Sequence, residues 1–228
     1  MHSNLKLGRI TGALLLFVFI SGVVIFQVLQ GPVLFSDQYL TATAAHSDQV
    51  ISSMVLGIFN GIVSIAIATI LLPTFKKYHR SLAYLYFAFC ILNFISIMID
   101  NVSVASLLEL SKIYVNGSTD ESLVTLGALA YERHFWTHYF YLLISCFPVF
   151  VFYYMLYLSR LVPKILSVFG LVAVLLMFIE ELASIYGSSI SMNMLLPIGL
   201  VQLVLPVWLL FKGFSTPKAA PELAESVE

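Results

Sequence analysis

The sequence is poor in charge. Only 10% of its 228 residues are charged and 60% are apolar, and the mean hydropathy is +0.98. A soluble domain usually carries roughly 25% charged residues, so this chain has too few to cover a water-facing exterior. The net charge of −1 gives no signal for a nucleic-acid partner. The composition therefore argues against a soluble enzyme, a nucleic-acid binder and a disordered chain.

Cysteine and recognisable catalytic motifs are also scarce. The two cysteines, Cys90 and Cys146, are too few for a disulfide framework. The sequence contains no phosphate-binding loop, no dinucleotide fingerprint and no nucleophile elbow. We therefore predict no cofactor, and the sequence favours a non-enzymatic protein without deciding the question.

Long apolar runs are what the chain does have. A membrane-spanning helix needs about 20 mostly apolar residues, and six segments meet this requirement. They cover residues 10–30, 49–75, 81–100, 135–158, 165–186 and 192–211. The sequence thus predicts an all-α fold, a single domain over residues 1–214 with six transmembrane helices. The polar residues 215–228 are predicted to form a disordered cytoplasmic tail.

The basic residues predict the orientation of this domain. Nine of the eleven lie before the first run, in the connections after the second and fourth runs, or after the sixth. Only Lys112 and Arg133 lie on the opposite side. Because cytoplasmic loops are enriched in Lys and Arg, we expect both termini in the cytoplasm.

Two stretches are expected on the outer side. Residues 31–48 are predicted to form a loop of moderate length, and residues 101–133 a longer one. Residues 118–121 resemble a capping box, which predicts a short amphipathic helix lying on the outer surface.

Three segments carry a resemblance to a known family. They are residues 37–40, residues 157–170 with the Arg-Leu-Val-Pro-Lys loop, and residues 196–214. In this order, within six apolar runs, they resemble the bacterial membrane family called domain of unknown function 4386. The resemblance implies a multi-pass protein of the bacterial cytoplasmic (inner) membrane, and it implies no activity. Relatives often carry charges in the third and sixth helices, where this chain has Cys90, Asn93 and Gln202.

Three amides are predicted near the middle of the membrane. Asn60, Asn93 and Gln202 each lie about 15–18 Å from a helix end at helical rise. They form either a polar ligand site or ordinary hydrogen bonds between helices, and we favour the second interpretation. Gly57 and Gly61 beside Asn60 make a G-x-x-x-G motif, which favours close helix packing.

A second polar group is predicted at the outer rim. It comprises Asp100, His134, His138, Glu180 and Glu181. The two histidines are four residues apart on one helix face, so with a neighbouring carboxylate they are candidate metal ligands. The alternative, which we favour, is that these side chains contact headgroups and loops at the interface.

Three functions remain open at this point. The leading hypothesis is a protein that binds or passes a small solute or lipid through the helix bundle. The first alternative is an enzyme at the outer surface that uses the histidines and a carboxylate. The second is an accessory or sensor subunit. The lipid bilayer is the expected partner, and a homo-oligomer or a membrane partner protein stays open.

Overall fold

The structure is a computed structural model that describes residues 2–117, 121–188 and 192–215. The predicted tail beyond Ser215 and the core of the predicted capping box, residues 118–120, lie outside this part. The elements are α1 (His2–Val23), the π-helix η1 (Val24–Gln30), α2 (Gly31–Leu34), α3 (Tyr39–Ala45), α4 (Ser47–Phe75), α5 (Arg80–Asn116), α6 (Glu121–Ser159), α7 (Lys164–Ile185), the 3-10 helix η2 (Met192–Leu195) and α8 (Leu196–Lys212). Among the described residues there is no strand, and the prediction of an all-helical chain is confirmed.

Six helical stretches are long and apolar enough to cross a membrane. They span residues 4–34, 47–75, 80–116, 121–159, 164–185 and 193–212. Large apolar side chains also cover their outward faces, among them Phe59, Ile99, Ile165 and Phe211, which are 55–76% exposed. An exterior of this kind suits hydrocarbon and not water.

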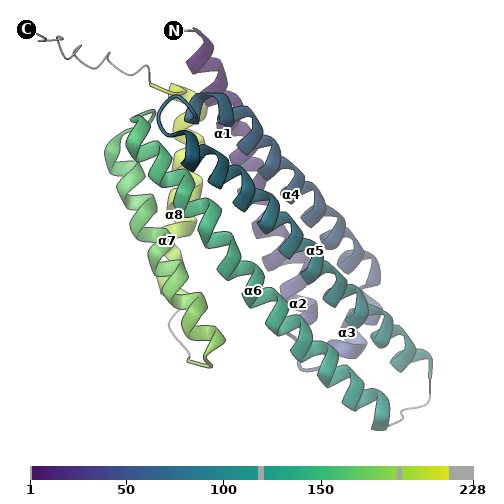
Figure 1. The fold of residues 1–228 in the computed structure, drawn as a ribbon. Helices are drawn as coiled ribbons and strands as arrows, with labels where there is room; N and C mark the ends of the chain where they lie inside the picture. Colours follow the sequence, from purple (N-terminus) through teal and green to yellow (C-terminus); the bar gives the residue numbers. More distant parts are fainter. Residues whose placement is uncertain (1, 118–120, 189–191, 216–228) are drawn as a thin grey trace, which may run out of the picture.

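The long helices form a ring. The ring contains six long helices in chain order, and each packs on the next: α1, α4, α5, α6, α7 and α8. The last of them, α8, closes the ring by packing on α1 (Figure 1). At the α1–α8 contact, the backbone N–H of Phe214 donates to the Asn4 carbonyl at 3.4 Å. The N-terminus, the α4–α5 and α6–α7 connections and the end of α8 lie together, and we call this the basic end because it carries Lys76, Arg160 and Lys164.

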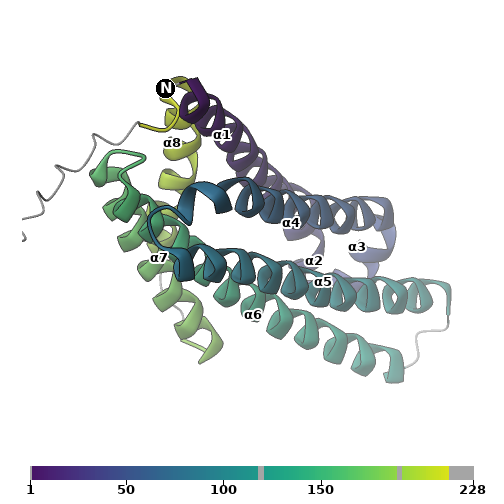
Figure 2. The ribbon, with the colours of Figure 1, turned by 45° about the horizontal axis from the view of Figure 1, so that its top comes forward.

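The distal end, opposite the basic end, differs from the sequence prediction. Residues 101–133 do not form a loop, because α5 continues to Asn116 and α6 begins at Glu121. These helices of 37 and 39 residues are about 55–60 Å long and extend past α7 and α8 (Figure 2). The loop predicted over residues 31–48 contains α2 and α3. Both predictions are wrong because the segments bury apolar residues against one another.

Two apolar cores hold the ring together, one at each end. At the distal end α2, α3, α4 and α5 bury Leu34, Val50, Val104 and Leu107. The larger core lies at the basic end and includes rings from three helices: Phe75 of α4, Tyr86 of α5 and Phe152 of α6. The centroids of these three rings lie 5.7–6.3 Å apart. The space enclosed by the six helices is thus filled by packed side chains at its basic end.

Glycine makes the closure between α1 and α8 possible. A Cβ atom at Gly12 would lie 2.8 Å from both the Leu209 Cβ and the Pro206 carbonyl oxygen, nearer than such atoms approach. We expect Gly12→Ala to lower the free energy of unfolding by about 1–3 kcal/mol, the usual cost of overpacking. Thermal unfolding of the purified protein measures this change.

The matched control for Gly12→Ala is Gly199→Ala. A Cβ atom at Gly199 meets nothing within 4 Å. Because alanine favours a helix over glycine by about 1 kcal/mol, this variant is expected to be as stable as the wild type or more so. Equal destabilisation by both substitutions would contradict the packing we describe.

Candidate functional site

A large cavity lies between the two cores and is lined by all six ring helices. Its volume is about 1320 Å³. Tyr86 and Phe152 form its floor toward the basic end, and Asp100 and His138 line it toward the distal end. Tyr86 and Asp100 are 14 positions apart on α5, which corresponds to about 21 Å along the helix. The cavity is therefore as long as about two-thirds of a membrane's hydrocarbon layer.

Asn60, the first of the three predicted amides, serves mainly to join helices. Its Nδ2 atom donates to the Val18 carbonyl at 2.8 Å and to the Ser21 hydroxyl at 2.7 Å, both on α1. These bonds tie α4 to α1 and leave Asn60 at the cavity wall. For this residue the geometry supports the interhelical hydrogen bond that we favoured from the sequence.

Replacing Asn60 by leucine tests this joining role. Leucine has a similar shape but donates no hydrogen bond, so the α1–α4 contact loses both interactions. We expect Asn60→Leu to lower the free energy of unfolding by about 0.6–2 kcal/mol. Ser64→Ala is the control, because the Ser64 hydroxyl donates within its own helix, to the Asn60 carbonyl at 3.0 Å. A destabilisation of the same size in the control would contradict the assignment.

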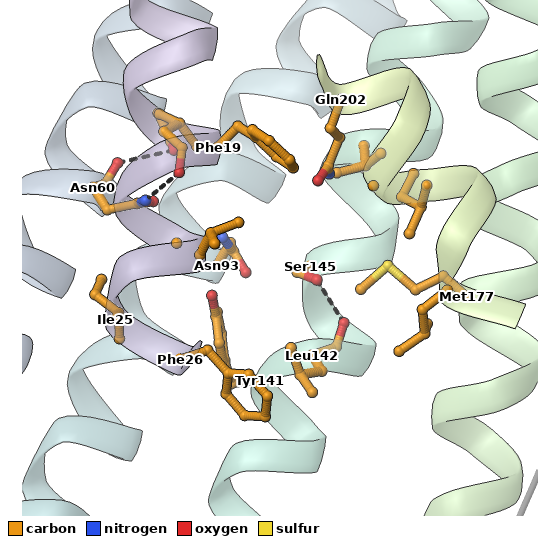
Figure 3. A pocket seen from close by; sticks show the side chains of 18 of the residues that line it. Phe19, Ile25, Phe26, Asn60, Asn93, Tyr141, Leu142, Ser145, Met177 and Gln202 are labelled. Carbon is orange, nitrogen blue, oxygen red and sulfur yellow. Dashed lines mark hydrogen bonds between the residues drawn. The ribbon is translucent and has the colours of Figure 1, made fainter. Parts of the chain in front are cut away.

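Asn93 and Gln202 behave differently from Asn60. Both line the cavity, and in Figure 3 their side chains extend into the open space between α5 and α8. The Oδ1 atom of Asn93 is buried and meets no hydrogen-bond donor among the described residues. The hydroxyl end of Tyr141 points toward Asn93, and Ser145 borders the same space. The three predicted amides thus line one cavity, while their role in binding a ligand stays a prediction.

The distal end of the cavity holds a buried polar cluster. The Nδ1 atom of His134 lies 3.2 Å from Asp100 Oδ1, and that of His138 lies 3.5 Å from Asp100 Oδ2. The Thr137 hydroxyl donates to Asp100 Oδ1 at 2.9 Å, and the Ser103 hydroxyl lies 2.7 Å from Thr137 Oγ1. Asp100, His134 and His138 are 2–8% exposed, so the cluster is screened from solvent. Asp100 is thus the carboxylate that α5 brings to the histidine pair of α6.

Glu180 and Glu181 form a second acidic group on the cavity wall. Both carboxyl groups are buried, at 7% and 1% exposure. The Ser184 hydroxyl donates to Glu180 Oε1 at 3.1 Å, whereas Glu181 Oε2 meets no donor within the described ranges. No salt bridge with either glutamate occurs in this part of the chain. The side chains of both glutamates therefore lie inside the bundle, while the interfacial role that we favoured from the sequence stays a prediction.

The π-helix η1 lies against His138. Its wide turn is closed by the Gly31 N–H, which donates to the Phe26 carbonyl five residues earlier. Pro32 follows and has no N–H to continue the ordinary helical pattern. Gln49 of α4 donates to the Val28 and Leu29 carbonyls at 3.1 and 2.9 Å and so supports the turn. Single π-turns are rare and often occur at functional sites.

This local geometry presents Phe26 to the site. The Phe26 ring stacks on the His138 imidazole with a centroid separation of 5.5 Å and an interplanar angle of 10°. The stacking fixes the imidazole against η1, so three helical segments, α5, α6 and η1, position the polar cluster.

Comparison with family models gives one match, described as Domain of unknown function (DUF4386), over residues 10–213. This range includes all six apolar helices and nearly the whole chain. The chain belongs to the DUF4386 family. Comparisons with curated proteins and with solved structures give no match. For this DUF4386 protein, functional inference must therefore start from the cavity itself.

The cavity unites two groups that the sequence alone left apart. In this DUF4386 chain the amides and four of the five outer-rim residues line the same space, and His134 joins it through Asp100. Sequence reasoning missed Tyr141, Ser145 and the π-helix. The sequence does contain a signal for Tyr141 and Ser145. They follow His138 at intervals of three and four residues, so they share the helix face of the histidine pair.

Proposed function

We propose that this chain is a multi-pass protein of the bacterial cytoplasmic membrane, with six spans and both termini in the cytoplasm. The six apolar helices and their apolar exterior support insertion. The clustering of basic residues and both described chain ends at the basic end supports the orientation, since cytoplasmic loops are enriched in Lys and Arg. We also propose that residues 1–214 act as a single domain.

Cysteine labelling tests this orientation. Cys90 and Cys146 are first replaced by alanine, and one cysteine is then introduced at exposed Lys77 or at exposed Glu109. In intact spheroplasts we expect a membrane-impermeant maleimide to label the Glu109→Cys variant and to label Lys77→Cys only after permeabilisation. The opposite pattern would invert the proposed topology.

We propose further that the protein binds an amphipathic molecule, a lipid or a lipid-like solute, within the ring. The cavity is the observation that carries this proposal. Its volume of about 1320 Å³ exceeds the 300–1,000 Å³ typical of small-molecule sites. Most of the wall's surface is apolar, and amide, hydroxyl, imidazole and carboxyl groups interrupt it. The packed rings of Phe75, Tyr86 and Phe152 close one end, which favours binding over passage in this conformation.

The polar groups of the wall indicate the chemistry of the ligand's head. Asn93 Oδ1 and Glu181 Oε2 are buried oxygens without a donor among the described residues. Unpartnered buried acceptors are costly, typically by about 1–3 kcal/mol each, and a ligand that donates hydrogen bonds removes that cost. An ammonium or hydroxyl head on an apolar chain therefore fits this wall better than a carboxylate head.

A paired ligand series tests the proposal. The protein is placed in lipid nanodiscs, and its thermal unfolding is followed with a single-chain amine, the matching alcohol and the fatty acid of equal chain length. We expect the amine or the alcohol to raise the unfolding temperature and the fatty acid to have little effect. If all three compounds changed the unfolding temperature equally, they would be partitioning non-specifically and the proposed head-group preference would be wrong. If none of them changed it, the proposal would be contradicted.

A further inference from the structure

The two histidine–aspartate distances of the polar cluster exceed those of charge-assisted hydrogen bonds and are close to the separation of two ligands on a shared metal ion. A charge-assisted N–H···O bond usually measures about 2.7–2.9 Å. The His134–Asp100 and His138–Asp100 separations are 3.2 and 3.5 Å. Two ligands on a tetrahedral zinc ion, each about 2.0–2.1 Å from the metal, lie about 3.3 Å from one another. The observed separations lie on either side of this value.

The ligating atoms converge and are shielded. One ligand atom from each of Asp100, His134 and His138 falls within a group whose members all lie within 4.8 Å of one another. His138 is 8% exposed, and its Nδ1 atom meets no hydrogen-bond partner within the described residues. A buried imidazole nitrogen without a partner, aimed at a carboxylate, is an unusual arrangement unless a further group binds there.

The surroundings of the carboxylate also resemble a metal site. Metal-binding side chains are usually held in place by hydrogen bonds from a surrounding layer of residues. Thr137 supplies such a bond to Asp100 Oδ1 at 2.9 Å, and Ser103 in turn contacts Thr137 at 2.7 Å. The stacking of Phe26 holds His138 from the other side. The cluster is thus built from three helical segments, α5, α6 and η1, and the Phe35 ring, just after α2, lies 6.5 Å from His134, centroid to centroid.

We propose that Asp100, His134 and His138 bind one divalent transition-metal ion of the zinc class at the distal end of the cavity. Two imidazoles with one carboxylate suit zinc and its neighbours, whereas calcium and magnesium prefer oxygen ligands alone. Three protein ligands leave a fourth position open on zinc. Because Asp100 and His138 line the cavity, that position is accessible to water or to a polar group of a bound molecule.

Metal analysis of the wild-type protein is the primary test, and it does not depend on any variant folding. The full chain is purified through a tag without histidine, stripped with a chelator and dialysed against Zn²⁺ or Co²⁺. We expect one equivalent of metal per chain, and visible absorption bands of four-coordinate Co²⁺. Failure of the wild type to bind either ion at micromolar concentration overturns the proposal.

Variants then locate the site. Asp100→Asn and His138→Gln each remove one ligand at nearly constant size. Loss of a supporting residue alone costs metal sites about 10–100-fold in affinity, so loss of a ligand is expected to weaken Zn²⁺ binding by about 100-fold or more. His46→Gln is the control, because His46 is exposed and its Nδ1 lies 3.0 Å from the Ala42 carbonyl oxygen, remote from the cluster. If His46→Gln loses the metal as fully as His138→Gln does, or if neither loses it, the assignment is overturned.

Thr137→Val provides a further readout. It keeps all three ligands and removes the hydroxyl that donates to Asp100 and contacts Ser103. We expect its Zn²⁺ affinity to fall by about 10–100-fold with the Co²⁺ spectrum retained.

The amphiphile experiment is independent of the metal experiment. Metal binding without amphiphile binding would support the metal site and contradict the proposed function. Amphiphile binding without metal binding would support the proposed function and contradict the metal site.

Discussion

The Ser145→Trp substitution is expected to abolish the stabilisation of the protein by the proposed amphipathic ligand. A ligand present at 100 times its dissociation constant stabilises the folded state by about 2.7 kcal/mol. In Ser145→Trp the indole occupies the space beside Asn93, Tyr141 and Gln202, so the ligand's head and first chain carbons are excluded. We expect the same ligand concentration to leave the unfolding temperature of this variant unchanged.

Position 145 suits this test because its own side chain joins no helices. The Ser145 hydroxyl donates to the Leu142 carbonyl of the same helix at 2.6 Å. Its loss therefore leaves the contacts between ring helices intact. The cavity has room for the larger side chain, so the unliganded variant is expected to unfold at a temperature close to that of the wild type.

Thr69→Trp is the matched control. Thr69 also donates to a carbonyl of its own helix, that of Ile65 at 2.8 Å, but it is exposed and does not line the cavity. This variant should keep the full ligand-dependent shift. If Ser145→Trp were stabilised as much as Thr69→Trp, the ligand would bind outside the cavity, and the proposed function would be wrong in its central point.

Loss of the Asp100 carboxylate is expected to cause the largest change in stability. In Asp100→Ala the Thr137 hydroxyl loses its acceptor, and the imidazoles of His134 and His138 lose the carboxylate that lies 3.2 and 3.5 Å from their Nδ1 atoms. Leaving a buried polar group without its partner costs about 1–3 kcal/mol, and this substitution affects three side chains at once. Denaturant or thermal unfolding in a fixed detergent measures the difference.

Asp37→Ala is the control for this loss of charge. Asp37 is exposed in the segment between α2 and α3, so its removal is expected to change stability by less than about 0.5 kcal/mol. Asp100→Asn should fall between the two, since the amide keeps an oxygen for the Thr137 hydroxyl. A stability of Asp100→Ala within the error of the Asp37→Ala value would show that the cluster contributes little to the fold.

Much of the ring was predictable because the interior faces of its helices follow one spacing. On α5 the wall residues recur at alternating intervals of four and three: Tyr86, Cys90, Asn93, Ile97 and Asp100. On α6 the same alternation connects His134, His138, Tyr141, Ser145, Pro148 and Phe152. Residues at these intervals share one face of a helix, so the spacing places Asn93 with Asp100 on one stripe and the two histidines on another. It does not tell which stripes meet.

The union of the two predicted sites depends on contacts between distant parts of the chain. Asn60 joins α1 because Val18 and Ser21 come within reach, and Gly12 lets α8 close against α1. The packing of α7 on α6 and α8 brings the face of α7 with Glu181 to the same space as α5. The spacing of residues within each helix carries no information on the order of the helices around the ring.

Two local features were missed for different reasons. The extension of α5 beyond Asp100 follows from burial of Val104 and Leu107 against α2 and α3, and that burial exists only in the folded chain. The π-helix has a visible cause in Pro32, but its stability also needs Gln49 of α4 to bond the Val28 and Leu29 carbonyls. Both are tertiary effects that override local preference.

Identification of the molecule that occupies the cavity tests the central claim most directly. The wild type and the Ser145→Trp and Thr69→Trp variants are purified from their own membranes under mild conditions and compared by native mass spectrometry. We predict a bound amphiphile on the wild type and on Thr69→Trp, with an amine or hydroxyl head, and its absence from Ser145→Trp. The same bound population on all three proteins, or on none, would contradict the account.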